Sequence, residues 1–148
     1  MYNPVHVSNN FLVRSFSQGV PVTAMKMQKM LYFLYRDYLK ETGIALFSER
    51  FSAWPYGPVL ESVYHTYKDF GANRIKNYGG TPVYSLMEED DPHLAGVISR
   101  IWNRSLPYDG IELSRLTHHL SGAWYQAWRR NYPFLLDEDI LQDNVEII

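Results

Sequence analysis

Residues 23–43 carry the most regular helical pattern in the sequence, and this pattern constrains the fold more than any other feature. Apolar side chains recur there at spacings of three and one: Met27, Met30, Leu31, Leu34, Tyr35 and Tyr38. Thr23 suits the N-cap of such a helix, and Gly43 suits its C-terminal stop. Tyr32 and Phe33 widen the apolar arc. We therefore predict a central helix that other elements cover on more than one side.

The segment Glu49–Val59 is the second informative stretch. Apolar and polar residues alternate over Phe51–Trp54, which is typical of a short half-buried strand. Pro55 and Pro58 restrict the backbone on either side of Gly57, so a rigid turn follows the strand. Pro58 also suits the first position of a helix, and we predict that the next helix begins there.

Two aromatic residues of this segment receive different predictions. Trp54 belongs to the predicted strand, and we expect its ring to lie in the core as part of the scaffold. The turn Tyr56-Gly57-Pro58 is the part that we expect to be exposed. It is therefore the open candidate for partner binding.

The rest of the chain predicts a mainly α fold, a compact bundle of about six helices with a small two-stranded β element. The further helices are expected at residues 4–18, 58–70, 92–106, 109–119 and 123–131, and acidic residues 88–91 suit the start of the third of these. Residues 83–86 form a candidate second strand that could pair with Phe51–Trp54. For residues 137–148 we predict either a short helix or a tail that only a partner orders. We expect residues 1–148 to form a single domain.

Composition places the chain in the soluble, intracellular class. Its 148 residues match one ordinary domain, and it contains no cysteine for disulfides or thiolate metal sites. We find neither an apolar run of about 18 residues nor a charged and then apolar leader. A cytoplasmic protein without membrane association is the resulting expectation.

Charge and aromatic content favour protein recognition over nucleic-acid binding. The net charge is −2, and the basic residues form no recognition face, which argues against a helix-turn-helix DNA reader. Residues 1–85 hold nine Lys/Arg against five Asp/Glu, whereas residues 86–148 hold five against eleven. The 12 Tyr and 4 Trp are residue types enriched at protein interfaces. We therefore expect a protein partner to meet aromatic and acidic surfaces.

The sequence offers little support for an enzyme. It lacks a phosphate-binding glycine loop, a dinucleotide fingerprint and a serine nucleophile elbow. His118 and His119 would point about 100° apart on a helix, so they cannot face one metal ion together. We predict no catalytic, cofactor-binding or metal-binding residues. For His118 we favour a structural hydrogen-bonding role with Thr117 and Trp124 as neighbours.

Four blocks of residues, in order along the chain, resemble the Panacea antitoxin domain family, which includes SocA-like and phage-associated GepA-like proteins. The blocks are Met27-Gln28-Lys29-Met30-Leu31-Tyr32-Phe33, the stretch Phe47–Val59 with Glu49, Trp54, Tyr56, Gly57 and Pro58, the pair Val63-Tyr64, and Leu113-Ser114 through His118 with Trp124. The resemblance spans about residues 20–130. The chain departs from the pattern at Ala123, where we expect a Pro before the Trp, and this affects the entry to the sixth helix.

The resemblance implies an antitoxin of a bacterial, prophage or phage toxin–antitoxin system. Such a protein would bind a cognate toxin directly and cover its working surface. SocA-like members instead resemble proteolytic adaptors that deliver a toxin to an ATP-dependent protease, and this is the alternative mechanism. A hydrolase-type enzyme using His118 with Lys29 or Glu49 is a second alternative. The chain has no room for an appended DNA-binding domain, and it carries no signal for an oligomeric state.

The candidate partner-binding or family residues are eight in number. They are Lys29, Glu49, Trp54, Tyr56, Gly57, Pro58, His118 and Trp124.

Overall fold

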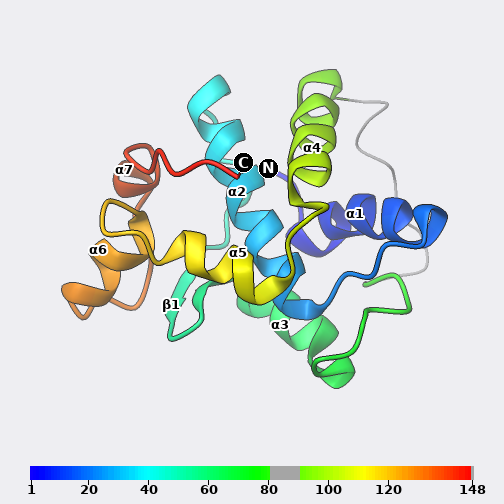
Figure 1. Ribbon diagram of the computed structural model, residues 1–148. Coiled ribbons are helices and arrows are strands. Elements are labelled where there is room, and N and C mark those ends of the chain that lie inside the picture. Colours follow the sequence, from blue (N-terminus) through cyan, green and yellow to red (C-terminus); the bar gives the residue numbers. More distant parts are fainter. Residues whose placement is uncertain (81–90, 148) are drawn as a thin grey trace.

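The computed structural model describes residues 1–80 and 91–147, and these residues form a mainly α fold with one small antiparallel sheet (Figure 1). The elements are α1 (Pro4–Gln18), α2 (Ala24–Thr42), β1 (Ser52–Trp54), β2 (Gly57–Val59), α3 (Glu61–Tyr67), the 3₁₀ turn η1 (Lys68–Phe70), α4 (Pro92–Ser105), α5 (Gly110–Thr117), α6 (Ala123–Arg129) and α7 (Asp137–Ile140). The predicted fold class is therefore confirmed.

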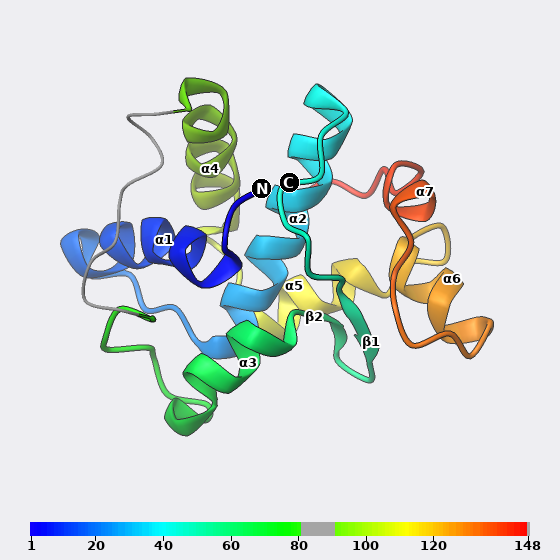
Figure 2. The same ribbon diagram turned by 180° about the vertical axis from the view of Figure 1, so that it is seen from behind.

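Helix α2 lies at the centre of the fold, as its apolar pattern indicates. Helices α1, α3, α4 and α5 and strand β2 all pack against it (Figures 1 and 2). The Thr23 hydroxyl caps its first turn by accepting from the Lys26 amide at 3.2 Å. Gly43 ends it in the left-handed conformation, with φ at 73°. The buried side chains of α2 extend around most of its circumference, so other elements cover the helix on several sides.

The segment after β1 differs from the prediction. Residues Gly57–Val59 form strand β2, which pairs with β1 in the register Ser52 with Val59 and Trp54 with Gly57. Helix α3 therefore begins at Glu61, and the predicted start at Pro58 is wrong. Pro58 stands opposite Ala53, whose amide points away from β2 and donates to Pro133 O at 2.8 Å. Since the Pro58 position likewise faces away from β1, its missing N–H removes no bond between the strands.

Two predictions concern residues outside the described ranges. These are the candidate strand 83–86 and the acidic residues 88–90. Asp91, the last residue of the acidic run, is described, and its carboxylate caps α4 by accepting from the Leu94 amide at 3.0 Å. The same carboxylate accepts from the hydroxyls of Tyr2 and Tyr38, which ties the start of α4 to the N-terminus and to α2.

The C-terminal segment after α7 lies along α2. The Asp143 side chain is 1% exposed and accepts from the Tyr32 hydroxyl at 2.5 Å, and its other oxygen lies 3.5 Å from the Arg36 guanidinium. The Lys40 ammonium donates to the Asp143 carbonyl, and Ile147 is buried in the core. In this structure the segment is ordered by α2 of its own chain.

The described residues also bear on membrane association. None of the helices in residues 1–80 and 91–147 combines the length and the apolar character needed to cross a bilayer.

Replacing Asp143 tests the attachment of the C-terminal segment. We expect Asp143→Ala to lower the free energy of unfolding by about 1–3 kcal/mol, because it leaves the buried Tyr32 hydroxyl without its acceptor, while Arg36 keeps Asp37 as its ion-pair partner. The measurement is urea denaturation at pH 7. Asp139→Ala is the control, because Asp139 pairs with the half-exposed Arg130 at 3.0 Å and such a pair contributes about 0–1 kcal/mol. Equal losses for the two variants would contradict this account.

Candidate functional site

Side chains from α2, from α5 with its C-cap, and from α6 contact five backbone carbonyls of the β1–β2 hairpin and of Leu60, which follows it. We call these five side chains the carbonyl clamp: Gln28, Lys29, Ser114, His118 and Trp124. Trp124 Nε1 donates to Trp54 O (2.6 Å), Ser114 Oγ to Tyr56 O (2.5 Å), Lys29 Nζ to Pro58 O (3.0 Å) and Gln28 Nε2 to Leu60 O (2.9 Å), while His118 Nε2 lies 2.9 Å from Pro55 O. The clamp fixes the hairpin through its backbone.

Helix α2 supplies the two most deeply buried parts of the clamp. The Gln28 amide binds both backbone groups of Leu60, because its Oε1 also accepts from the Leu60 amide at 2.9 Å. Lys29 is 1% exposed, and this burial lowers the pKa of its ammonium group to about 7. Its bond to Pro58 O partly replaces the water that the ammonium loses on burial.

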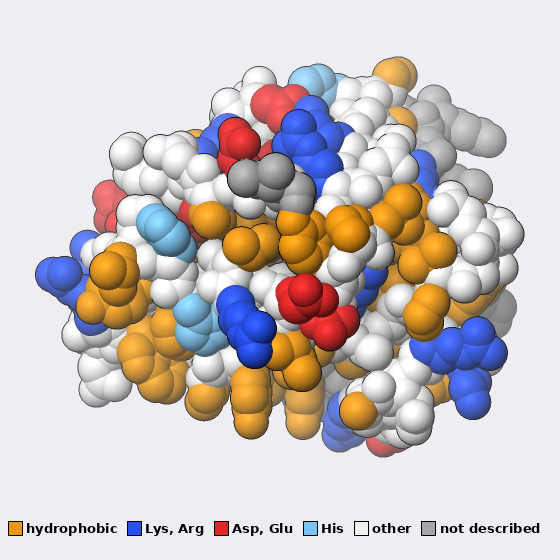
Figure 3. Space-filling model, in the orientation of Figure 1, with side chains coloured by type: hydrophobic (Ala, Val, Ile, Leu, Met, Phe, Trp, Pro, Cys, Tyr) orange, Lys and Arg blue, Asp and Glu red, His pale blue; other side chains and the backbone are white. Residues whose placement is uncertain are grey.

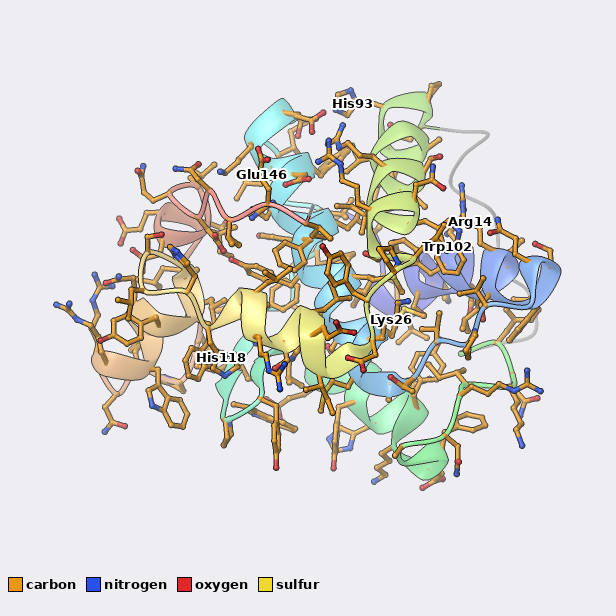
Figure 4. All side chains as sticks on the ribbon, in the orientation of Figure 1. Arg14, Lys26, His93, Trp102, His118 and Glu146 are labelled. Atoms are coloured by element: carbon orange, nitrogen blue, oxygen red, sulfur yellow. The ribbon has the colours of Figure 1, made fainter. Side chains whose placement is uncertain are left out.

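Helices α5 and α6 supply the other part of the clamp. His118 lies at the end of α5, beside the hairpin (Figure 4), with Nδ1 2.6 Å from Ser114 O. Each contact of the ring with a carbonyl is a hydrogen bond when that nitrogen carries a proton. The ring also packs on Trp124 at a centroid distance of 4.0 Å, and Trp124 stacks on Trp128 at 5.1 Å. Thr117 Oγ1 lies 3.4 Å from His118 Nδ1.

Gly57 allows the hairpin to approach the clamp closely. Its φ is 112°, a conformation that residues with a Cβ rarely adopt. A Cβ on this residue would lie 2.6 Å from Thr117 Oγ1 and 3.2 Å from Lys29 Nζ. Both the backbone conformation and the available space therefore require glycine at this position.

The hairpin exposes other residues than the sequence predicted. Tyr56 is 67% exposed, but Gly57 and Pro58 are buried, so the expectation that the whole turn is exposed is wrong. Pro55 is exposed instead. Trp54 is half-buried rather than a core residue, and its ring packs edge-on against Tyr64 at 4.9 Å. The turn projects because the clamp binds only its carbonyls.

Glu49 stabilises the start of α3, and its carboxylate is held by Ser62. The N-cap position of α3, Leu60, offers no side-chain acceptor. The Glu49 carboxylate instead accepts from the Ser62 amide at 3.0 Å and from the Ser62 hydroxyl at 2.5 Å. A carboxylate at this place accepts a hydrogen bond from a free amide of the first turn. It also interacts favourably with the positive end of the helix dipole.

The geometry does not bring Lys29, Glu49 and His118 together on an open cleft. Lys29 and His118 bind different hairpin carbonyls, and Glu49 binds Ser62. In residues 1–80 and 91–147 no cluster of three or more His, Asp or Glu side chains is arranged to hold a metal ion. The polar atoms of these residues bind backbone and hydroxyl groups of the chain itself.

The acidic half of the chain contributes less surface charge than its composition indicates. Asp91, Asp137 and Asp143 accept hydrogen bonds from tyrosine hydroxyls, and Asp139 pairs with Arg130. These carboxylates hold helices and the C-terminal segment in place. The expected acidic binding surface is therefore smaller than the sequence implied.

Sequence reasoning missed two members of the carbonyl clamp as site residues, Gln28 and Ser114. Both are buried polar residues beside family-like positions, Gln28 before Lys29 and Ser114 four residues before His118. Their polarity within otherwise apolar helix faces was the available signal. A buried polar side chain needs a hydrogen-bond partner, and the nearby proline-rich hairpin has carbonyls in excess of amides.

Comparison with known proteins matches residues 27–125 to the family described as antitoxin SocA-like, Panacea domain. The matched residues include the whole carbonyl clamp and the hairpin. The chain belongs to this family. The resemblance read from the four sequence blocks is thus confirmed.

One relative is the protein named Antitoxin SocA from Caulobacter vibrioides (strain NA1000 / CB15N), which is 32% identical over 71 residues. The match covers 48% of this chain and 38% of the relative, so the chain spans well under half of the length of that protein. No solved structure matches the chain.

Lys29 should make stability depend on pH. The native Lys29 loses its proton near pH 7, whereas the unfolded lysine keeps it to about pH 10.4. Between these values the unfolded state binds more protons, so the free energy of unfolding rises with pH, by about 1.4 kcal/mol per unit from this group. We expect urea denaturation between pH 7.5 and 9.5 to show this slope.

Lys29→Met is the variant that isolates the contribution of Lys29 to this slope. Burial also lowers the pKa values of Lys26 and Lys40, but both residues remain in the variant. The difference between the two slopes therefore reports Lys29 alone. Parallel stability curves for the wild type and the variant would contradict the burial of a titrating ammonium group.

Proposed function

We propose that this protein is an antitoxin that neutralises a partner toxin by direct protein–protein binding in the bacterial cytoplasm. Membership of the antitoxin SocA-like family supports the general role, and so does the name of the Caulobacter relative. The match covers only part of that relative, so the neutralisation mechanism rests on the structure of this chain. By binding, this protein would cover the working surface of the toxin.

The observation that carries this proposal is the exposed aromatic surface beside the clamped hairpin. Tyr56 is 67% exposed, Trp128 47% and Tyr64 40%. Figure 3 shows hydrophobic side chains gathered along the lower edge of the molecule, over the hairpin and α6. Tyrosine and tryptophan supply large contact areas at low entropic cost and dominate binding energy at interfaces. A rigid hairpin that presents such residues is suited to protein recognition.

The geometry gives the hydrolase alternative no support. Such an enzyme would need a nucleophile and a base within hydrogen-bond reach of each other. Lys29 and His118 are instead bound to Pro58 O and Pro55 O, and Glu49 is bound to Ser62. These hydrogen bonds account for all three of the residues that this alternative requires.

Co-expression tests the antitoxin role. We expect the open reading frame beside this gene to stop bacterial growth when induced alone and to be harmless when this chain is co-expressed. The two purified proteins should form a complex by size-exclusion chromatography. Gly57→Val is the matched loss-of-function control, because the left-handed φ and the short contacts to Thr117 and Lys29 exclude a branched side chain.

Toxin lifetime separates direct binding from proteolytic delivery. Under direct binding, the half-life of the toxin is unchanged by this chain after translation is blocked. A half-life that shortens in a manner dependent on an ATP-dependent protease would replace the proposal with the adaptor mechanism. A neighbouring gene product that is harmless alone, or that this chain does not neutralise, would contradict the antitoxin proposal itself.

A further inference from the structure

The His118 ring lies between two backbone carbonyl oxygens. Its Nδ1 is 2.6 Å from Ser114 O, and its Nε2 is 2.9 Å from Pro55 O. Thr117 Oγ1 lies 3.4 Å from Nδ1, but its single proton is used in a hydrogen bond to Ser114 O at 2.6 Å. A carbonyl oxygen only accepts, so each of the two contacts is a hydrogen bond only when the ring supplies the proton.

Only the doubly protonated ring can make both of these hydrogen bonds. A neutral imidazole carries one N–H, and its other nitrogen presents a lone pair. In either neutral tautomer this lone pair would point at a carbonyl oxygen, at 2.6 Å or at 2.9 Å. The imidazolium ion donates to both oxygens instead, and hydrogen bonds from a charged donor are about twice as strong as neutral ones.

Two further features of the surroundings suit a positive charge on the ring. His118 is the C-cap residue of α5, where unpaired carbonyls form the negative end of the helix dipole. The ring also packs on Trp124 at a centroid distance of 4.0 Å, and the face of an indole attracts cations. The surroundings of His118 are therefore complementary to the imidazolium ion.

Helix α2 and the hairpin contribute one cationic group close to this region. A Cβ on Gly57 would lie 2.6 Å from Thr117 Oγ1 and 3.2 Å from Lys29 Nζ, so Lys29 lies across Gly57 from the end of α5. A charge on Lys29 opposes one on the ring, but burial lowers the pKa of Lys29 to about 7, which removes this opposition at alkaline pH. Residues 51–60 contain no charged side chain, and their titratable group is the phenol of Tyr56.

Other charged groups lie on α5, on α6 and in the C-terminal segment. Glu112 and Arg115 are exposed on α5, and Arg129 is exposed at the end of α6, so water and salt screen their charges. Asp143 lies beside the loop between α5 and α6, and its ion pair with Arg36 offsets its charge. The hydrogen-bond partners of the ring nitrogens are thus the two uncharged carbonyls, and the number of protons on the ring decides which of them are bound.

We propose that His118 fixes the tip of the hairpin, Pro55 and Tyr56, to α5 only in its doubly protonated form. With both protons present, the ring joins Pro55 O to Ser114 O. When one proton is lost, the other stays on Nδ1, because Ser114 O is the closer acceptor and belongs to the same helix end. The bond to Pro55 O is then broken, and the tip moves more freely.

This proton-dependent attachment acts on the part of the hairpin that carries the exposed Tyr56 ring. A tip that is ordered before binding loses less entropy when a partner docks. If the toxin binds there, its affinity would be greater at the lower pH, and this consequence alone rests on the proposed antitoxin function. The attachment itself is a property of the free protein.

NMR spectroscopy of the free protein tests this attachment. The signals of the ring nitrogens, followed from about pH 5 to about pH 9, report how many protons His118 carries. The second readout is the order parameter of the Tyr56 Cα–H bond, because a hydrogen bound to carbon is not lost to exchange at high pH. We expect this order parameter to fall from about 0.85, typical of a rigid backbone, toward about 0.6 as His118 loses its second proton.

Two glutamine variants separate His118 from other titrating groups. His118→Gln keeps a side chain that can donate to a carbonyl but does not titrate, so its Tyr56 order parameter should be independent of pH. His119→Gln is the matched control, because His119 is adjacent and exposed and its Nδ1 lies 2.7 Å from Ser121 Oγ. This control should keep the pH dependence of the wild type. Lys29 is present in both variants, so its own titration cannot produce a difference between them.

Three results would overturn the proposal. The first is a Tyr56 order parameter that stays constant while the wild-type His118 ring titrates, and the second is a ring whose proton number does not change over this pH range. The third is a pH dependence that persists in folded His118→Gln, which would assign the effect to Lys29. If thermal melting shows that His118→Gln does not fold, the wild-type titration still decides. The toxin takes no part in the experiment, so failure here leaves the antitoxin role to its own co-expression test.

Discussion

Hydrogen bonds from buried side chains to the backbone carbonyls of the hairpin are the interactions on which the rest of the structure depends. The hairpin has only three residues in each strand, and a two-stranded sheet of this size is marginal alone. The carbonyl clamp joins it to α2, α5 and α6, which are distant in sequence. Because the donors bind backbone atoms, the side chains of Pro55 and Tyr56 remain exposed.

The clamp also explains an otherwise costly feature of the central helix. Burying a lysine in the core opposes folding unless a partner compensates for the lost hydration. Lys29 has such a partner in Pro58 O, and Gly57 leaves the space for its approach. Lys29 and His118, which the hydrolase alternative would use as catalytic residues, thus serve to fix the hairpin. This view connects the family membership of residues 27–125 with the exposed aromatic surface.

Local patterns predicted the helices well and the hairpin poorly. The apolar periodicity of α2 identified the central element, since each turn of that helix contributes to the same core. The prediction that a helix starts at Pro58 was wrong because proline suits both the first turn of a helix and the outward-facing position of a strand. The choice depended on Lys29 and on the pairing of Ser52 with Val59, contacts between separate segments that local patterns do not encode. For the same reason, the exposure of Pro55 and the burial of Gly57 and Pro58 became visible only in the structure, whereas the exposure of Tyr56 was predicted.

Amide hydrogen exchange of the free protein tests the central claim most directly. The clamp makes the hairpin part of the cooperative core, so the amides of Ala53, Gly57 and Leu60 should exchange with free energies close to those of the α2 amides. Leu60 is the most informative of these, because its amide donates to buried Gln28. Rapid exchange throughout the hairpin while α2 stays protected would show that the clamp does not hold it, and would contradict the account.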